Sequence, residues 1–478
     1  MNRKKKILFL LFAIAYVSYH LFTLVISPLP WFDETFFASI SRSYLELGLF
    51  QAKVAMVWSY AKNILAYGPV YFWLTSFSIK IFGFGIFQFR IVCLLFGFAM
   101  LFLFYRLLPS QANKLIFLAL FSLDTIVHSG MHSGRMDTMA VSFLLLCIYF
   151  FLRSGDNKFY LNVLLSGLFA AAALLTTPRS GVFFIPLGLL MLYRFLHHRQ
   201  IKYFIAGLIW LVLIIALYAF WFAYAFGSLN NFLLYYKQVN SMIAVAFYIP
   251  KYQYPLIVLS IVAVLYGFIV RRKEYFTEKN IISLLSILSF YAFIHDTGAY
   301  SIFIIPFYYL LIADGFASQK ISFKNWKVIL VALLLAFNVG IFSIKSLVLF
   351  SDMNNRRPAI ADQFVAVNIP PGEKVIGDEL FYYSIIKAGS DFQYINLYST
   401  DEEREKYHRE KYDYDYVIWS DRLEKTEPDL LKLYFRNSEF QKVGELTLPS
   451  NNLYAISRFI GFNVSGSYNC RIYKRVKG

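Results

Sequence analysis

The chain has 478 residues, 58% of them hydrophobic, and a mean hydropathy of +0.54. Soluble domains carry about 45–50% apolar residues, so the composition excludes an ordinary soluble protein and predicts a polytopic α-helical membrane protein. The net charge is +17, but Lys and Arg stand in short clusters between apolar runs. That pattern indicates positive-inside topology rather than a nucleic-acid-binding face, so no nucleic-acid partner is expected.

The amino terminus reads "MNRKKK" and is followed by an apolar run over residues 7–27. The run is roughly 20 residues long, enough to cross a bilayer, and no A-x-A-like cleavage site ends it. We therefore expect an uncleaved signal anchor with its amino terminus in the cytoplasm.

Further apolar runs follow in chain order at 68–83, 88–107, 114–130, 138–153, 159–177, 181–196, 203–226, 254–270, 280–295, 299–317 and 327–349. If 68–83 does not span, the basic clusters between the runs all fall on the side of "MNRKKK". The charge rule then favours about eleven spans, with the N-terminus inside and the C-terminus outside. Residues 68–83 are predicted to lie in, or dip into, the outer interface, within a long first outer loop over 28–87.

The composition changes near residue 351 to that of a soluble domain. Residues 1–350 are predicted to form the membrane domain and 351–478 an extracytoplasmic α/β domain large enough to bury its own core. "KVIG", "DFQYINLY" and "YDYDYVIWS" are typical of strands, and "STDEEREKYHREK" of a helix capped by Ser399 or Thr400.

Asp33 and Glu34 follow the first span by a few residues, in "PLPWFDETFFASISRSY". Two hydrated acids at a helix exit are the simpler interpretation. Ionisable groups near a membrane more often mark function when several converge, and the predicted topology places others on the same side.

Arg135 and Asp137, in "HSGRMDTMAV", and Arg179, in "LLTTPRSGVFF", stand at predicted outer helix ends. An arginine beside a helix amino terminus suits a phosphate, although an ion pair or an interfacial anchor is equally consistent with these residues. Tyr300, in "GAYSIFIIP", lies at another outer helix mouth, where an aromatic-belt role is the simpler alternative.

His128 and His132 are spaced i, i+4 on one helical face. They could share a metal ion with a carboxylate such as Asp137, although buried structural histidines are commoner than metal ligands. No cofactor is required by the sequence; a divalent cation is the one we consider.

Together these residues predict an outward-facing site with a candidate base, several cations and a lipid-accessible aromatic wall. Such a site suits an anionic lipid that carries a group to be transferred. The chemistry would be displacement at a carbon bearing a phosphate leaving group, with a carboxylate accepting the proton of an incoming hydroxyl.

The order of "FDETFFASISRSYL", "YGPVYFWLTSFSIKIFG", "FRIVCLLFG", "SGRMDTMAVSFLLL", "LLTTPRSGVFFIPLGLLMLY" and "YSIFIIPFYYLLIADG" resembles a known family. It is similar to the polyprenyl-phosphate-dependent glycosyltransferases of superfamily C (GT-C), which include the lipid A aminoarabinose transferases and the dolichyl-phosphate-mannose protein mannosyltransferases. The resemblance covers most of residues 1–317.

The resemblance implies an inverting transferase in a bacterial inner membrane, acting on its outer side. The donor would be a sugar on a polyprenyl phosphate, and the acceptor a hydroxyl of a lipid, glycan or protein. Asp33 would be the base and Glu34 its orienting neighbour, with donor phosphate contacts from a set of cations and tyrosines: Lys62, Tyr67, Arg135, Arg179 and Tyr300.

Two positions depart from the aminoarabinose transferases. Tyr67-Gly68-Pro69 stands where they have a lysine and paired prolines, and Phe36 replaces an arginine. Both changes remove phosphate contacts that the family would supply, and they argue against aminoarabinose and lipid A as substrates. A transporter or flippase for a lipid-linked sugar, or a silent binder of one, remains an alternative.

Overall fold

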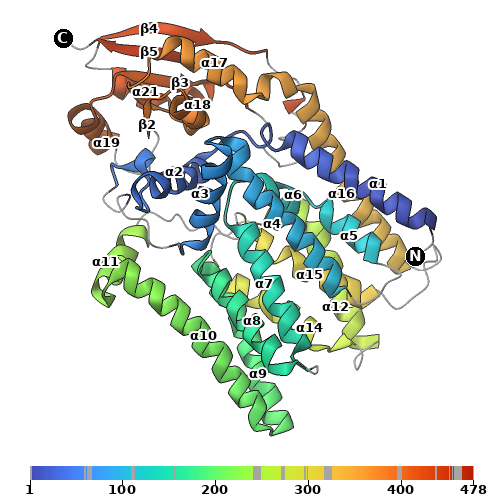
Figure 1. The fold of residues 1–478 in the computed structure, drawn as a ribbon. Coiled ribbons are helices and arrows are strands. Elements are labelled where there is room, and N and C mark those ends of the chain that lie inside the picture. The colour runs from blue at the N-terminus through green and yellow to red at the C-terminus, as the bar shows by residue number, and fades with distance from the viewer. Residues whose placement is uncertain are drawn as a thin grey trace.

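The computed structural model describes residues 3–58, 61, 67–108, 114–155, 158–240, 249–270, 275–294, 298, 300–316, 326–395, 401–435, 439–449, 451, 453–454, 456 and 466–476. Helices fill the first three quarters of the chain, and a five-stranded sheet with short helices forms the rest (Figure 1).

The main helices of the first part are α1 (Arg3–Thr23), α2 (Phe32–Leu47), α3 (Val70–Phe82), α4 (Ile86–Leu107), α5 (Lys114–Ser122), α6 (Thr125–His132), α7 (Asp137–Leu152), α8 (Phe159–Leu174), α9 (Phe184–His198), α10 (Ile201–Phe226), α11 (Leu229–Asn240), α12 (Tyr254–Val270), α14 (Glu278–Phe293), α15 (Ile305–Phe316) and α16 (Trp326–Ser351). Each predicted span contains a helix. Among the described residues, five helical segments are long and apolar enough to cross a membrane, or six if the bent pair α5–α6 is counted as one span. The chain is thus a polytopic membrane protein, while the count of eleven crossings stays a prediction.

The run at 114–130 is not one straight helix, as the hydropathy suggested. It is broken between α5 and α6 by a bend of 59°. A new helix, α6, begins after Asp124, because the buried carboxylate of Asp124 accepts hydrogen bonds from the backbone N–H groups of Ile126 and Val127 and so caps its amino terminus. Tyr309 of α15 donates to the same carboxylate at 2.9 Å.

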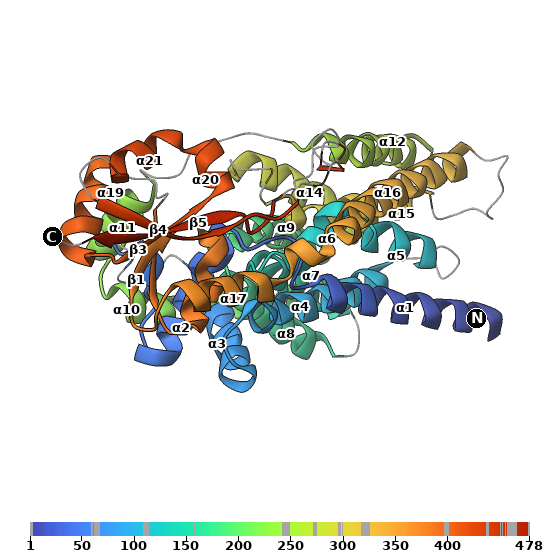
Figure 2. The same cartoon turned by 90° about the horizontal axis from the view of Figure 1, so that it is seen from above.

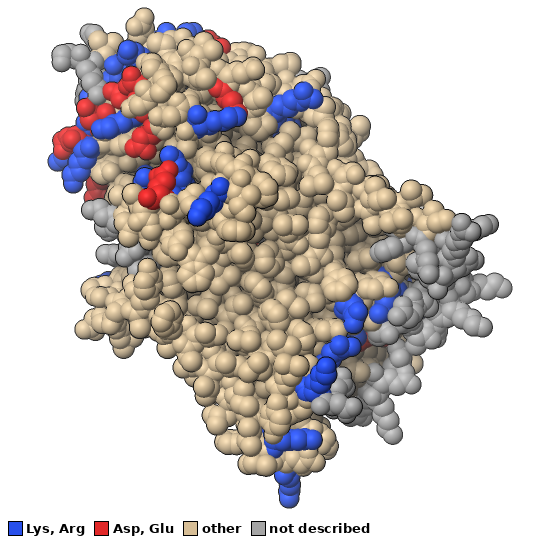
Figure 3. Space-filling view, viewed as in Figure 1, with Lys and Arg blue, Asp and Glu red and all other residues tan. Residues whose placement is uncertain are grey.

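The start of α1 and the sheet lie at opposite ends of the molecule (Figure 2). On the face in Figure 3, charged side chains of both signs gather over the sheet end, and mainly Lys and Arg gather at the other end of the helices. The described surface between these ends shows few Lys, Arg, Asp or Glu side chains on this face. A membrane protein with its basic side in the cytoplasm would have this charge distribution.

The C-terminal part contains α17 (Pro358–Asn368), β1 (Lys374–Gly377), α18 (Tyr382–Lys387), β2 (Asp391–Tyr394), α19 (Asp401–Tyr407), β3 (Tyr416–Ser420), α20 (Asp421–Thr426), α21 (Pro428–Phe435), β4 (Glu439–Leu446) and β5 (Cys470–Val476). The strand order is β2-β1-β3-β5-β4, with β2, β1 and β3 parallel and β5 antiparallel to β3 and β4. The three predicted strands and the predicted helix are present, whereas β4 and β5 were not anticipated. The proposed caps Ser399 and Thr400 lie outside the described residues.

The sheet does not bury all its apolar surface within its own domain. One core cluster, around Trp419 and Tyr434, belongs to the C-terminal part alone. Another joins sheet residues such as Val375 and Phe392 to Phe37 of α2 and to other residues of α2–α4. This shared core fixes the sheet against the helix that begins at the acidic pair.

Candidate active site

Asp33 lies in the first turn of α2, where the positive end of the helix dipole favours a carboxylate. Its side chain is 34% exposed, so it is open to an incoming molecule. Glu34, the next residue, is completely buried. Successive residues on a helix point about 100° apart, which turns one carboxylate outward and the other into the core.

Arg135, in the turn between α6 and α7, links two carboxylates. Its Nη1 lies 3.2 Å from Asp33 Oδ2 and its Nε 2.7 Å from Asp137 Oδ2. Burial disfavours charge on the guanidinium, but Asp137 and Asp33 outweigh it and hold the pKa of Arg135 well above its ordinary value. The indole of Trp31, which donates from Nε1 to the Ser133 carbonyl at 3.0 Å, lies 5.5 Å from the same guanidinium.

Arg179 follows Pro178 at the start of a 3-10 turn that leads into α9. Its guanidinium lies 3.9 Å from the ring centre of Tyr300 and 5.9 Å from that of Tyr67. Arg135 lies 4.7 Å from the centre of the same Tyr300 ring. Tyr300 is therefore shared by two cations from different loops. Among the described carboxylates, none lies within ion-pair distance of Arg179.

Glu34 forms a buried ion pair with Arg90 of α4. Arg90 Nε and Nη2 donate to the two carboxylate oxygens at 2.9 and 2.6 Å. Arg90 Nη1 also donates to the carbonyls of Leu24 and Pro28, at 2.7 and 2.8 Å. Arg90 thus ties the end of the first helix, the following turn and the start of α2 together beneath Asp33.

The C-terminal part reaches the same turn of α2. Tyr383 donates to Glu34 Oε1 at 3.2 Å. Tyr394, at the end of β2, donates to the Phe32 carbonyl at 3.1 Å and shares a hydrogen bond of 2.6 Å with the Thr35 hydroxyl. The residues on both sides of Asp33 are therefore fastened to the sheet.

The structure brings together six of the residues singled out from the sequence: Asp33, Tyr67, Arg135, Asp137, Arg179 and Tyr300. Lys62 lies outside the described residues. The structure does not bring Asp137 to the two histidines with which it was considered as a metal ligand: Asp137 pairs with Arg135, while His128 and His132 lie against His20.

From the sequence, Arg90 stood out only as part of the family-like stretch "FRIVCLLFG", with no partner assigned, and nothing singled out Tyr383 or Tyr394. Arg90 carried a usable signal, since an arginine in an apolar helix needs a buried partner. The tyrosines carried none, because the domain contact that places them is tertiary.

Part of the chain matches the sequence model of a known protein family. Residues 66–224 match the sequence model of the family described as dolichyl-phosphate-mannose-protein mannosyltransferase. The match covers about a third of the chain, and it bears out the resemblance to the polyprenyl-phosphate-dependent glycosyltransferases of superfamily C that the sequence shows. A search of curated protein sequences gives no significant match.

Particular solved structures share the fold over nearly the whole chain. ArnT from Cupriavidus metallidurans bound to undecaprenyl phosphate matches with a TM-score of 0.63 at 13% identity, covering 98% of each chain. Its apo state matches with a TM-score of 0.59 at 13% identity, covering 99% of this chain and 98% of that one. The archaeal oligosaccharyltransferase AglB from Archaeoglobus fulgidus, in complex with an inhibitory peptide and a dolichol-phosphate, matches with a TM-score of 0.52 at 11% identity, covering 91% and 72%. At these identities the likeness concerns the fold.

Proposed function

We propose that this protein is an inverting glycosyltransferase that moves a sugar from a polyprenyl-phosphate carrier to an acceptor hydroxyl on a lipid, glycan or protein. The observation that supports it most is that one partly exposed carboxylate, Asp33, pairs with Arg135, and that Arg135 shares the Tyr300 ring with a second arginine, Arg179. A base and a cationic phosphate site side by side are what such a displacement needs.

In the proposed step, Asp33 accepts the proton of the acceptor hydroxyl. The oxygen attacks the anomeric carbon from the face opposite the phosphate, and the bond between that carbon and the phosphate oxygen breaks. The electron pair leaves with the phosphate, so the anomeric configuration inverts. Arg135 holds Asp33 in place through the contact at 3.2 Å.

We assign the departing phosphate to Arg179 first. Arg135 is already engaged by two carboxylates, whereas Arg179 is held by aromatic rings. Arg179 has a side-chain hydrogen bond to Tyr67, and its stacking on the Tyr300 ring leaves its other N–H groups for phosphate binding. Tyr67 and Tyr300 would position this guanidinium.

The proposal requires no divalent cation at Asp33, because Arg135 pairs with both Asp33 and Asp137 and Arg179 is a second cation that acts on Asp137. Transfer that continues after treatment with EDTA would agree with this; loss of transfer that Mg²⁺ or Mn²⁺ restores would contradict it.

Glu34 fits an orienting role. Its burial and its bidentate pair with Arg90 leave its carboxylate no access to a substrate, but they fix the turn that presents Asp33. We further propose that this site faces the outer side of a bacterial inner membrane. Support comes from the basic end of the molecule opposite the sheet.

The decisive assay uses purified protein in lipid nanodiscs, radiolabelled polyprenyl-phosphate sugars and a membrane extract as the source of acceptor. Asp33→Asn is expected to lower transfer at least 100-fold, and Glu46→Gln, a half-exposed acid on the same helix, is the matched control. Wild-type transfer by Asp33→Asn would overturn the proposal. Label moved across a sealed vesicle without forming a product would instead indicate a flippase.

Binding of undecaprenyl phosphate tests the phosphate site separately. Arg179→Ala is expected to weaken binding about 10-fold or more, while Arg153→Ala, an exposed arginine at the end of α7, should leave it unchanged. Equal affinities for wild type and Arg179→Ala would contradict the assignment.

A further inference from the structure

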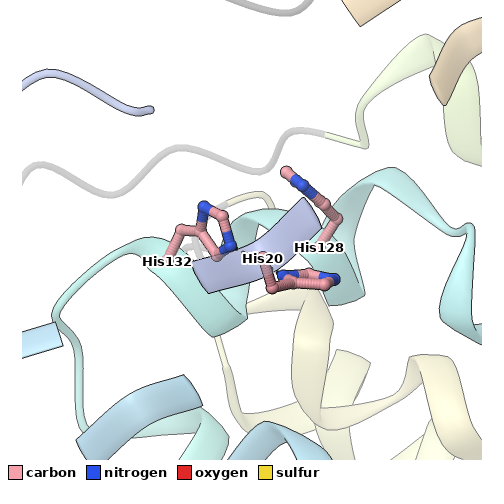
Figure 4. Close-up of side chains that lie close together, drawn as sticks. All are labelled: His20, His128 and His132. Atoms are coloured by element: carbon pink, nitrogen blue, oxygen red, sulfur yellow. Dashed lines mark hydrogen bonds between the residues drawn. The ribbon is translucent and has the colours of Figure 1, made fainter. Parts of the chain in front are cut away.

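Three buried histidines meet behind the candidate active site. His20 comes from α1, and His128 and His132 come from α6 (Figure 4). Each offers one ligand-type nitrogen, and these nitrogens all lie within 4.8 Å of one another. The sequence indicated two of the three; His20 lies more than a hundred residues away from them and joins only through the packing of α1 on α6.

The hydrogen-bond partners define how these rings are protonated. His132 Nδ1 lies 2.9 Å from the Ser27 carbonyl, which can only accept, so Nδ1 donates and Nε2 is left as an acceptor. His132 Nε2 lies 2.7 Å from His20 Nδ1, which therefore donates. His128 Nδ1 receives a hydrogen bond from the Lys345 ammonium at 2.9 Å.

Two ring nitrogens are left over. His20 Nε2 and His128 Nε2 are buried and have no hydrogen-bond partner in the described part of the chain. An unsatisfied buried polar atom costs about 1–3 kcal/mol, and two such atoms in one cluster point to a missing ligand.

From this geometry we propose that His20, His128 and His132 bind a transition-metal dication of the zinc class. Neutral imidazoles are preferred ligands of Zn²⁺, and three of them leave one open coordination position. The bond from His132 Nδ1 to the Ser27 carbonyl is the outer contact that metal-bound histidines normally make. This inference does not depend on the proposed transferase activity.

Binding requires an adjustment at each of the three rings. Zn–N distances of about 2.0–2.1 Å in a tetrahedral site separate ligand nitrogens by about 3.3 Å, so His20 Nδ1 and His132 Nε2 must move apart from their present 2.7 Å. His20 must also change tautomer, because the proton that its Nδ1 now donates has to move to Nε2 before Nδ1 can bind the metal. If His128 ligates through Nε2, its Nδ1 carries the proton, and Lys345 must turn to Ser129 Oγ, which it already contacts at 3.1 Å.

The metal ion would fasten the first span to the turn that holds Arg135. Ser27 precedes Asp33 by one short loop, and His132 precedes Arg135 by less than one helical turn. A structural site here would stabilise the two segments that form the acidic and cationic halves of the candidate active site.

The test uses full-length protein purified through a tag that contains no histidine, stripped with a chelator and dialysed against Zn²⁺. We expect about one zinc per chain by mass spectrometry of the metal, and less than a fifth of that in His128→Ala. His197→Ala, with its exposed ring near the end of α9, is the control and should bind like wild type. Lys345→Met removes a nearby cation and is expected to tighten zinc binding at least threefold.

A second measurement needs no variant. In wild-type protein loaded with zinc, X-ray absorption should show three imidazole nitrogens at about 2.0 Å, and zinc should raise the melting temperature. Wild-type protein that retains no zinc, His128→Ala that retains as much as wild type, or a spectrum without imidazole scattering would each overturn the proposal and leave the cluster as a hydrogen-bonded chain.

Discussion

Replacing Arg90 with methionine should destabilise the protein strongly. Arg90 and Glu34 are both completely buried, and Arg90 makes four hydrogen bonds, two to the carboxylate and two to backbone carbonyls. Removing one member of a buried ion pair costs about 3–5 kcal/mol, because the other charge stays buried without a partner. The carbonyls of Leu24 and Pro28 also lose their hydrogen bonds from Arg90, so the expected loss of unfolding free energy lies at the upper end of that range.

A double-mutant cycle separates the lost pair from lost packing. Glu34→Gln keeps the shape of the side chain and an acceptor for Arg90, so its cost should be smaller than that of Arg90→Met. The combination of both changes removes the unpaired carboxylate and should recover about 1–3 kcal/mol of the loss in Arg90→Met. Arg42→Met, which breaks a partly exposed pair with Glu46, should cost less than about 1 kcal/mol.

The assay is thermal unfolding in detergent, followed by intrinsic fluorescence at one fixed heating rate, since membrane proteins seldom unfold reversibly. The expected order of melting temperatures is wild type, Glu34→Gln, the double variant, then Arg90→Met. The reasoning is refuted if Arg90→Met melts with wild type, or if the double variant melts no higher than Arg90→Met.

Three further predictions concern other parts of the fold. Burial, then a neighbouring carboxylate, raises the pKa of Glu379 to about 7; stability should therefore fall as the pH rises from 4.5 to 7, and Glu379→Gln should flatten the difference in melting temperature over that window. A Cβ at Gly68 would lie 1.9 Å from the carbonyl oxygen of Leu175, just after α8. Gly68→Ala should therefore reduce the free energy of unfolding by about 3 kcal/mol or more and lower the melting temperature. Gly188→Ala is the control, because the space around Gly188 is open, and it should melt with wild type. Tyr394→Phe removes the hydrogen bonds to the Phe32 carbonyl and to the Thr35 hydroxyl. Transfer should slow severalfold with a stability loss of about 2 kcal/mol, and unchanged transfer would contradict a positioning role.

The sequence located the residues around Asp33 because each stood at the end of an apolar run. Arg135, Arg179 and Tyr300 could be assigned to one side by charge bias alone, and the structure places them around Asp33. The strands with compact apolar patterns were predicted for the same reason: local periodicity is visible in a single chain.

What the sequence could not show depends on packing across elements. His20 reads as one polar residue in a signal-anchor-like helix until α1 lies against α6. Asp124 interrupts an apolar run that hydropathy averages over, and its capping role is evident only from the bend. The sheet was expected to bury its own core, but part of its apolar surface packs against residues of α2–α4, a contact between segments far apart in the sequence that local patterns do not reveal.

The acidic pair shows how one local sequence produces two environments. Asp33 and Glu34 share a helical turn and the same helix dipole. Asp33 is about one-third exposed and pairs with Arg135, whereas Glu34 is completely buried and forms a bidentate pair with Arg90. A carboxylate locked by two charge-assisted bonds is held in position and is unavailable to an incoming hydroxyl. A carboxylate such as Asp33, with one longer contact at 3.2 Å, can give up that contact and accept the proton of a substrate hydroxyl. Adjacent residues with separate environments can therefore take separate roles, Asp33 in chemistry and Glu34 in holding the turn that presents it.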